Sequence, residues 1–166
     1  MPSTLSALFE HNLWANLGLL GACRPATPDQ LAHEVPGSYG PPAATLLHML
    51  SGEQSYVWRL NGEEREDRLQ SDHPWPGVDA LMEHGRWSGE RLIALAVTLQ
   101  PEDAVRMYDD ETGRHMNASV VLVQAISHSA HHRSQVMTAL SSQGIIFPEF
   151  DGWEWGEATA AVHTRS

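Results

Sequence analysis

The sequence predicts an all-α fold, a four-helix bundle that forms one domain over residues 1–166. Four long segments repeat apolar residues at steps of three and four, which is the period of a helix with one buried face. Glycine or proline stands at the ends of these segments, and no segment has the alternating pattern of a long strand. A chain of 166 residues is long enough to bury a single core.

The first two helices have clear boundaries. One is expected over about residues 4–23, where Ser3 can cap the first turn and Pro25 follows the last. A loop rich in proline and glycine comes next. The second helix is expected to begin at a Pro-Pro pair and to cover residues 41–60, with Gly62 as its stop signal.

The second half of the chain predicts two more helices and a small hairpin. The third helix is expected over about residues 78–99. Residues 105–116 contain the turn-forming run DDETG between short stretches of β-forming residues, which favours a hairpin. Asn117 is then in position to cap a fourth helix that runs to about residue 142, with Gly144 after it.

The fourth helix carries the most informative motif, SHSAHHRSQ, at residues 127–135. His128 and His132 are four residues apart, so both imidazoles project from one face and can bind the same metal ion. Small and apolar residues surround the pair on the helical wheel, whereas Arg133 points in another direction. The pair also fits two half-buried histidines that are hydrogen-bonded to backbone or carboxylate groups. His131 is a rival ligand through its three-residue spacing from His128, but it lies further from the apolar face.

The candidate third ligand is His48, in the middle of the second helix. The residues that share its helix face are all small, namely Ala44, Ser51, Gly52 and Ser55. This face borders either a cavity or solvent, and the helical wheel leaves both interpretations open. The remaining histidines lie in expected loops, near the termini or without a partner at ligand spacing, and we interpret them as ordinary polar residues; they occupy positions 11, 33, 73, 84, 115 and 163.

Three histidines would form an open metal site. Neutral imidazole suits zinc, nickel, copper and iron(II), and three protein ligands leave coordination positions for water or substrate. At such a site a bound water can lose a proton near neutral pH, and a thiol is deprotonated. A structural metal site has a complete set of four ligands more often, and no fourth ligand is evident.

Composition excludes several classes of function. The formal charge is −11 with only ten Lys plus Arg and no basic cluster, so we expect no nucleic-acid partner. The single cysteine, Cys23, excludes an intrachain disulfide and suits a reducing cytoplasm; we interpret it as a small buried apolar residue rather than a nucleophile. The N-terminus lacks the features of a signal peptide, and no run approaches about 18 apolar residues, so we expect a soluble cytoplasmic protein with no membrane partner.

The order and spacing of these motifs resemble the DinB-like family of damage-inducible four-helix-bundle metalloproteins. The resemblance covers nearly the whole chain: HNLWANLGLL in the first helix, His48 followed by Glu53 and Trp58, HSAHHRSQVMTALSSQG in the fourth helix, and a closing PEFDGW. The family hallmark places metal ligands at His48, His128 and His132, followed by Arg, a small residue and Gln. Ser134 replaces the glycine that usually precedes this glutamine.

The resemblance implies an up-down-down-up bundle that is commonly dimeric and binds a divalent metal such as zinc or nickel. Members with known activity include transferases and isomerases that use bacillithiol, mycothiol or glutathione. The mycothiol-dependent maleylpyruvate isomerases carry glutamate where this chain has His128, so the all-histidine set resembles the bacillithiol-transferase-like branch. Many relatives have no assigned reaction.

The leading hypothesis is therefore a metal-dependent transferase that activates a low-molecular-weight thiol and delivers it to an electrophile. Gln135 would support the site as a polar neighbour, and Tyr56 or Trp58 would form a wall of the pocket. The alternative is a non-catalytic metal-binding bundle of the stress response, in which the ion adds folding stability.

Overall fold

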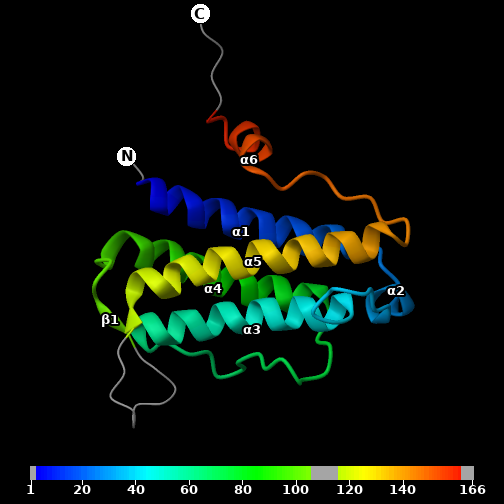
Figure 1. Ribbon diagram of the computed structural model, residues 1–166, viewed down its shortest axis with the longest axis horizontal. Helices are drawn as coiled ribbons and strands as arrows, with labels where there is room; N and C mark the ends of the chain where they lie inside the picture. The colour runs from blue at the N-terminus through cyan, green and yellow to red at the C-terminus, as the bar shows by residue number, and fades with distance from the viewer. Residues whose placement is uncertain (1–2, 106–115, 162–166) are drawn as a thin grey trace, which may run out of the picture.

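The computed structural model describes residues 3–105 and 116–161 and is mostly helical (Figure 1). The elements of the described residues are six helices and one pair of short strands, namely α1 (Thr4–Ala22), α2 (Pro28–Ala32), α3 (Pro42–Asn61), α4 (Val78–Thr98), β1 (Ala104–Val105), β2 (Met116–Asn117), α5 (Ala118–Ser141) and α6 (Gly152–Ala158). The four long helices agree with the expected ones to within one residue at each end. Among the described residues, none of these helices combines the length and the apolar character needed to cross a bilayer.

The local signals in the sequence act largely as expected. The Ser3 side chain accepts a hydrogen bond from the backbone of Ser6, and Gly62 ends α3 in the left-handed conformation with a φ of 83°. Gly144 has the same conformation after α5, with a φ of 88°. Asn117 occupies the N-cap position of α5, although its side chain makes no capping hydrogen bond.

The predicted hairpin is present at its base. β1 and β2 pair in antiparallel orientation, with Ala104 opposite Asn117 and Val105 opposite Met116. The remainder of the predicted hairpin, residues 106–115, lies outside the described residues.

Two short helices were not predicted from the sequence: α2 lies in the expected loop after the first long helix, and α6 lies in the C-terminal region, for which no element was predicted. α2 is held by a capping box in which Thr27 and Gln30 bond each other's backbone, and α6 is capped by the Asp151 side chain. Helices of five and seven residues are too short to show a helical period, so only their capping residues could have indicated them.

The long helices surround a core with two apolar clusters. α1 packs against α4 and α5, and α3 packs against the same two helices. One cluster contains Leu19, Leu50 and Leu81, and the other contains Phe9 and Val57. Buried polar residues lie between these clusters along the helices, and they include Asn12, Asn16, Glu53, Ser88, Ser129 and Arg133.

Candidate metal centre

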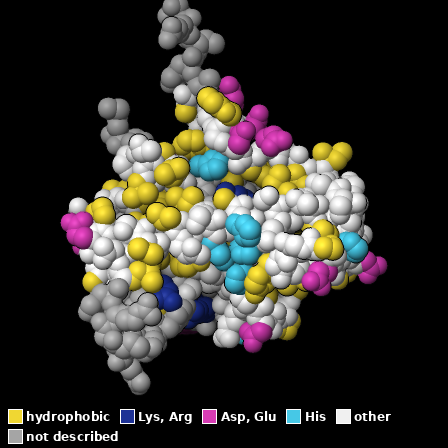
Figure 2. All heavy atoms as spheres, viewed as in Figure 1, with side chains coloured by type: hydrophobic (Ala, Val, Ile, Leu, Met, Phe, Trp, Pro, Cys, Tyr) yellow, Lys and Arg dark blue, Asp and Glu magenta, His cyan; other side chains and the backbone are white. Residues whose placement is uncertain are grey.

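Three histidines from two helices converge at the surface between α3 and α5. His48 projects from α3, His128 and His132 project from α5, and one ligand atom of each lies within 4.8 Å of the others. Figure 2 shows a group of histidine side chains in the middle of one face of the molecule. The Nε2 atoms of His48 and His128 are 3.1 Å apart. Tetrahedral zinc with Zn–N bonds of 2.0–2.1 Å separates its nitrogen ligands by about 3.4 Å, so the arrangement is close to what an ion requires.

Hydrogen bonds orient two of the three imidazoles. Nδ1 of His48 lies 3.3 Å from the Ser71 hydroxyl, which lies 2.9 Å from the hydroxyl of Ser51. Nδ1 of His132 lies 2.8 Å from the side-chain oxygen of Gln135 and donates its proton to it. A proton on Nδ1 leaves Nε2 with its lone pair free, and this is the tautomer that binds a metal through Nε2. The expected supporting role of Gln135 therefore has a direct geometric basis.

His128 occupies space that only a glycine at position 52 provides. A Cβ added to Gly52 would lie 2.9 Å from Cε1 of the His128 ring. The Tyr56 ring packs edge-on against the same imidazole, with the ring centroids 5.7 Å apart. His128 Nδ1 is buried and has no hydrogen-bond partner among the described residues. Its ring is therefore positioned by packing. Trp58, the other residue expected to form a wall of the pocket, is half-buried and lies further along α3.

All three imidazoles are held in the neutral form that metal binding requires. Burial lowers the pKa of His48, and proximity to His132 lowers it further. Burial and the three neighbouring histidines lower the pKa of His128 to about 4. Burial also lowers the pKa of His132, against the opposing effect of its bond to Gln135. Protons therefore compete weakly with a metal ion at neutral pH.

Tyr39 forms an aromatic wall that the sequence did not predict. Its ring stacks on His48 with centroids 4.0 Å apart and planes 14° apart, and it meets His132 edge-on at 5.5 Å. Tyr39 and Ser71 both lie in connections between helices, where no periodic pattern indicates which side chains approach a site.

His131 lies beside the centre rather than in it. Its side chain is exposed, and its ring centroid is 5.2 Å from that of His132. The Gln135 amide nitrogen lies 3.1 Å from Nε2 of His131, so Gln135 bridges the two neighbouring histidines. The rival ligand is consequently separated from the group of three.

The other described histidines make ordinary polar contacts or lie at the surface. His11 bonds the Phe150 carbonyl, whereas His84 is buried and accepts a hydrogen bond from Gln54. His33 and His73 are exposed, and positions 115 and 163 lie outside the described residues.

A buried polar network lies directly beneath the histidines. The carboxylate of Glu53 is fully buried and accepts hydrogen bonds from four side chains on the other three long helices; these are Asn12, Asn16, Ser88 and Ser129. Arg133 donates to the side-chain oxygens of the two asparagines. Burial raises the pKa of Glu53, while its hydrogen-bond donors and the charge of Arg133 act in the opposite direction. Arg133 therefore points into the bundle, away from the three histidines.

The Cys23 thiol has low reactivity. It is fully buried in an apolar cluster, and burial raises the pKa of its thiol to about 12. The thiolate form that would act as a nucleophile is therefore scarce at neutral pH.

Comparisons with known proteins agree with this architecture. The DinB family model matches residues 1–161. A solved DinB-like protein from Bacillus cereus ATCC 10987 is 14% identical in sequence, covers 90% of this chain and 99% of its own, and superposes with a TM-score of 0.59. This likeness shows the fold, and no curated protein matches the sequence. The family match extends over nearly the whole length, and the chain belongs to the DinB family.

Proposed function

We propose that this protein is a divalent-metal-dependent transferase that activates a low-molecular-weight thiol and delivers it to an electrophile. One observation carries the proposal: three neutral imidazoles converge from two helices, and the Nδ1 atoms of His48 and His132 are engaged by Ser71 and Gln135. The donor set fits zinc or nickel and leaves coordination positions open.

The described residues explain what the chain would contribute. His48, His128 and His132 would hold the ion, which when bound lowers the pKa of a coordinated thiol. Tyr39 and Tyr56 would form the aromatic sides of the site. In the transfer, the thiol sulfur bonds to the electrophilic carbon, the leaving group departs with its electron pair, and the thiol proton passes to solvent.

Finer features of the proposal rest on separate observations. The all-histidine ligand set supports the bacillithiol-transferase-like branch over the one with a glutamate ligand. The acidic charge of −11 supports small-molecule partners rather than nucleic acid, and the single cysteine supports a location in the reducing cytoplasm. Val120 and Val123 are 52% and 68% exposed on α5, and exposed apolar side chains close together on one helix support a homodimer.

We also infer the up-down-down-up order of the bundle. Along α1 and α5 the cluster containing Phe9 comes before the cluster containing Leu19, whereas α3 and α4 pass through the two clusters in the opposite order. This alternation supports one direction for α1 and α5 and the opposite direction for α3 and α4.

Metal analysis of matched histidine variants tests the site. The purified protein should contain about one divalent ion per chain, as expected for a three-histidine site. His132→Ala should lose the ion, whereas His131→Ala, which removes the exposed neighbour on the same helix, should keep it. Full metal retention in His132→Ala, or equal loss in both variants, would reject the assigned ligands. Thiol consumption is then measured with bacillithiol and glutathione against a panel of electrophiles, and turnover should disappear together with the metal.

The second candidate is a non-catalytic metal-binding bundle of the stress response. It is favoured by the origin of the ligands on two helices, because an ion that joins α3 to α5 would stabilise the fold. Chelation separates the two candidates. Loss of the helical circular-dichroism signal on metal removal, with no turnover in the thiol panel, would support the structural role.

A further inference from the structure

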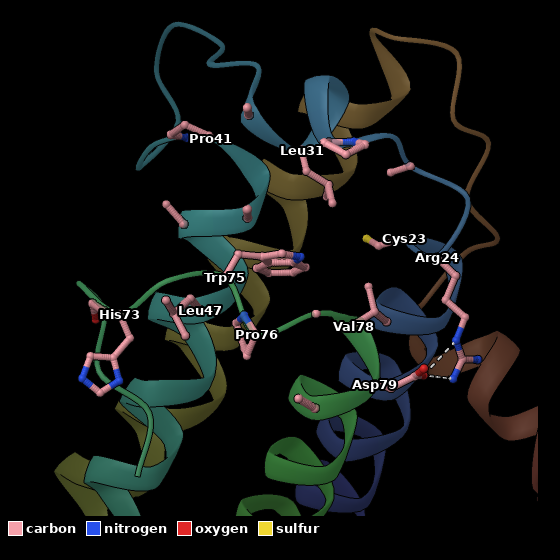
Figure 3. A pocket seen from close by; sticks show the side chains of 18 residues that line it. Cys23, Arg24, Leu31, Pro41, Leu47, His73, Trp75, Pro76, Val78 and Asp79 are labelled. Carbon is pink, nitrogen blue, oxygen red and sulfur yellow. Dashed lines mark hydrogen bonds and ion pairs between the residues drawn. The ribbon is translucent and has the colours of Figure 1, made fainter. Parts of the chain in front are cut away.

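A large cavity lies at the end of the bundle, and none of the three candidate ligands His48, His128 and His132 lines it. It is formed where α1 ends and where α3 and α4 begin, and α2 and the segment 71–77 border it (Figure 3). Its volume is about 980 Å³. Small-molecule sites in proteins typically have volumes of about 300–1,000 Å³, so the cavity can hold a ligand of considerable size.

The lining of the cavity is mainly apolar. Leu31, Leu47 and Val78 contribute aliphatic surface, and Cys23 lies on the α1 side. Figure 3 shows the indole ring of Trp75 projecting into the space between α2 and α3. An indole ring provides a flat, polarisable surface against which another ring can pack at centroid distances of about 4.5–7 Å.

The charges around the cavity are balanced. Arg24 and Asp79 line it, and their side chains bond each other at its edge (Figure 3). The Cys23 thiol stays protonated because burial raises its pKa to about 12. Apart from the His73 imidazole, no described side chain of the lining is therefore an unpaired cation or anion, and the net charge of −11 disfavours anionic ligands at longer range.

One polar group of the lining connects the cavity with the metal centre. The Ser71 side chain borders the cavity, and its hydroxyl lies 3.3 Å from Nδ1 of His48. The same hydroxyl lies 2.9 Å from the hydroxyl of Ser51. A hydroxyl group has one donor and two acceptor lone pairs, so beside these two contacts Ser71 can still accept a hydrogen bond from a ligand.

We propose that this cavity is a binding site for an uncharged small molecule with a ring-containing apolar body, which lies against Trp75 and directs one hydrogen-bonding group to Ser71. The proposal follows from the volume, the apolar lining, the indole wall and the paired charges. It does not depend on the transferase reaction, because none of these features involves the three imidazoles directly.

Binding of an uncharged fluorescent probe tests the proposal. N-phenyl-1-naphthylamine is titrated into the full-length, metal-loaded protein and should bind saturably with blue-shifted emission. Ala43→Phe fills the cavity from α3 and should weaken binding by about tenfold or more, which corresponds to about 1.4 kcal/mol. Ala130→Phe places the same ring on the surface of α5, outside the cavity, and should leave binding unchanged. Absence of saturable binding, or wild-type affinity in Ala43→Phe, would overturn the proposal.

Two further measurements keep the test independent of folding and of the metal centre. If circular dichroism shows that Ala43→Phe is unfolded, Trp75→Ala replaces it, and its affinity should fall. The affinity of Trp14→Ala should stay constant, because the Trp14 ring packs against Phe150 and does not line the cavity. Binding should persist in His132→Ala, so failure of the metal assignment and failure of this proposal give different results. The anionic probe 1-anilinonaphthalene-8-sulfonate should bind more weakly than the uncharged probe, and tighter binding would refute the assigned ligand class.

Discussion

Substitution of Gly52 should separate metal affinity from fold stability. A Cβ at this position would lie 2.9 Å from Cε1 of His128. Carbon atoms in contact are normally about 3.5–4.0 Å apart, so the methyl group of Gly52→Ala requires the His128 ring to move by about 0.5 Å or more. The backbone of α3 needs no change, because alanine fits a helix interior.

The two effects of Gly52→Ala have opposite signs. Metal ligands need to be held within about 0.5 Å of their productive positions, and disturbing the support of a ligand typically costs about 10–100-fold in metal affinity. Alanine in turn favours a helix over glycine by about 1 kcal/mol. We therefore expect weaker metal binding in a variant whose metal-free form is at least as stable as the wild type.

The assay measures both quantities on the same samples. Zinc affinity is obtained by competition with a chromophoric chelator, and the free energy of unfolding is obtained from urea denaturation of metal-free protein. Gly21→Ala is the matched control, because a Cβ at Gly21 on α1 meets nothing within 4 Å. It should leave metal affinity unchanged. Wild-type zinc affinity in Gly52→Ala would refute the packing argument for His128.

Three other predictions concern the surroundings of the site. Ser71→Ala removes the hydroxyl beside Nδ1 of His48 and should weaken zinc binding by about tenfold in the same competition assay, with the helical content unchanged. Glu53→Gln leaves the buried charge of Arg133 without its counter-charge and should lower the free energy of unfolding by about 3 kcal/mol in urea titrations; a loss below 1 kcal/mol would contradict this role. For metal-free protein, burial lowers the pKa of His84 in the native state, so the unfolded chain binds the additional proton and stability falls as the pH drops from 7 to 5. His84→Gln should reduce this slope, to which one histidine contributes up to about 1.4 kcal/mol per pH unit.

Local sequence signals were sufficient for the long helices and for pairing two of the three histidines of the candidate metal centre. The three- and four-residue period defined the long helices because one face of each is buried. His128 and His132 could be paired because four residues on one helix fix their relative direction. His48 could only be proposed, since its distance from the other two depends on how α3 packs against α5.

The residues that support the candidate metal centre could not be predicted from the sequence, and the reason is physical. Ser71 and Tyr39 lie in connecting segments, and their approach to His48 depends on the path of these segments over the bundle. Gly52 was recognised as part of a small-residue face, but the space that it leaves for His128 is created by a neighbouring helix.

The buried polar network around Glu53 and Arg133 forms only because several residues from different helices meet. A buried carboxylate or guanidinium group is unfavourable alone and becomes acceptable only when several partners meet it. Arg133 reaches Asn12 across 121 positions of sequence, so no window of the chain contains the partners that make its burial feasible. The helical wheel excluded Arg133 from the histidine face but could not show that its direction leads into the core.

The buried polar network and the candidate metal centre both join α3 to α5, and this affects the choice between the two functional proposals. Ser129 and Arg133 each follow a metal-ligand candidate on α5, and Ser129 donates a 3.0 Å hydrogen bond to Glu53 on α3. Buried hydrogen bonds and apolar packing therefore join α3 to α5 independently of the three imidazoles. An ion is then not needed to hold the two helices together, so its binding free energy can serve the chemistry of an open coordination position. The transferase is therefore favoured over the structural alternative.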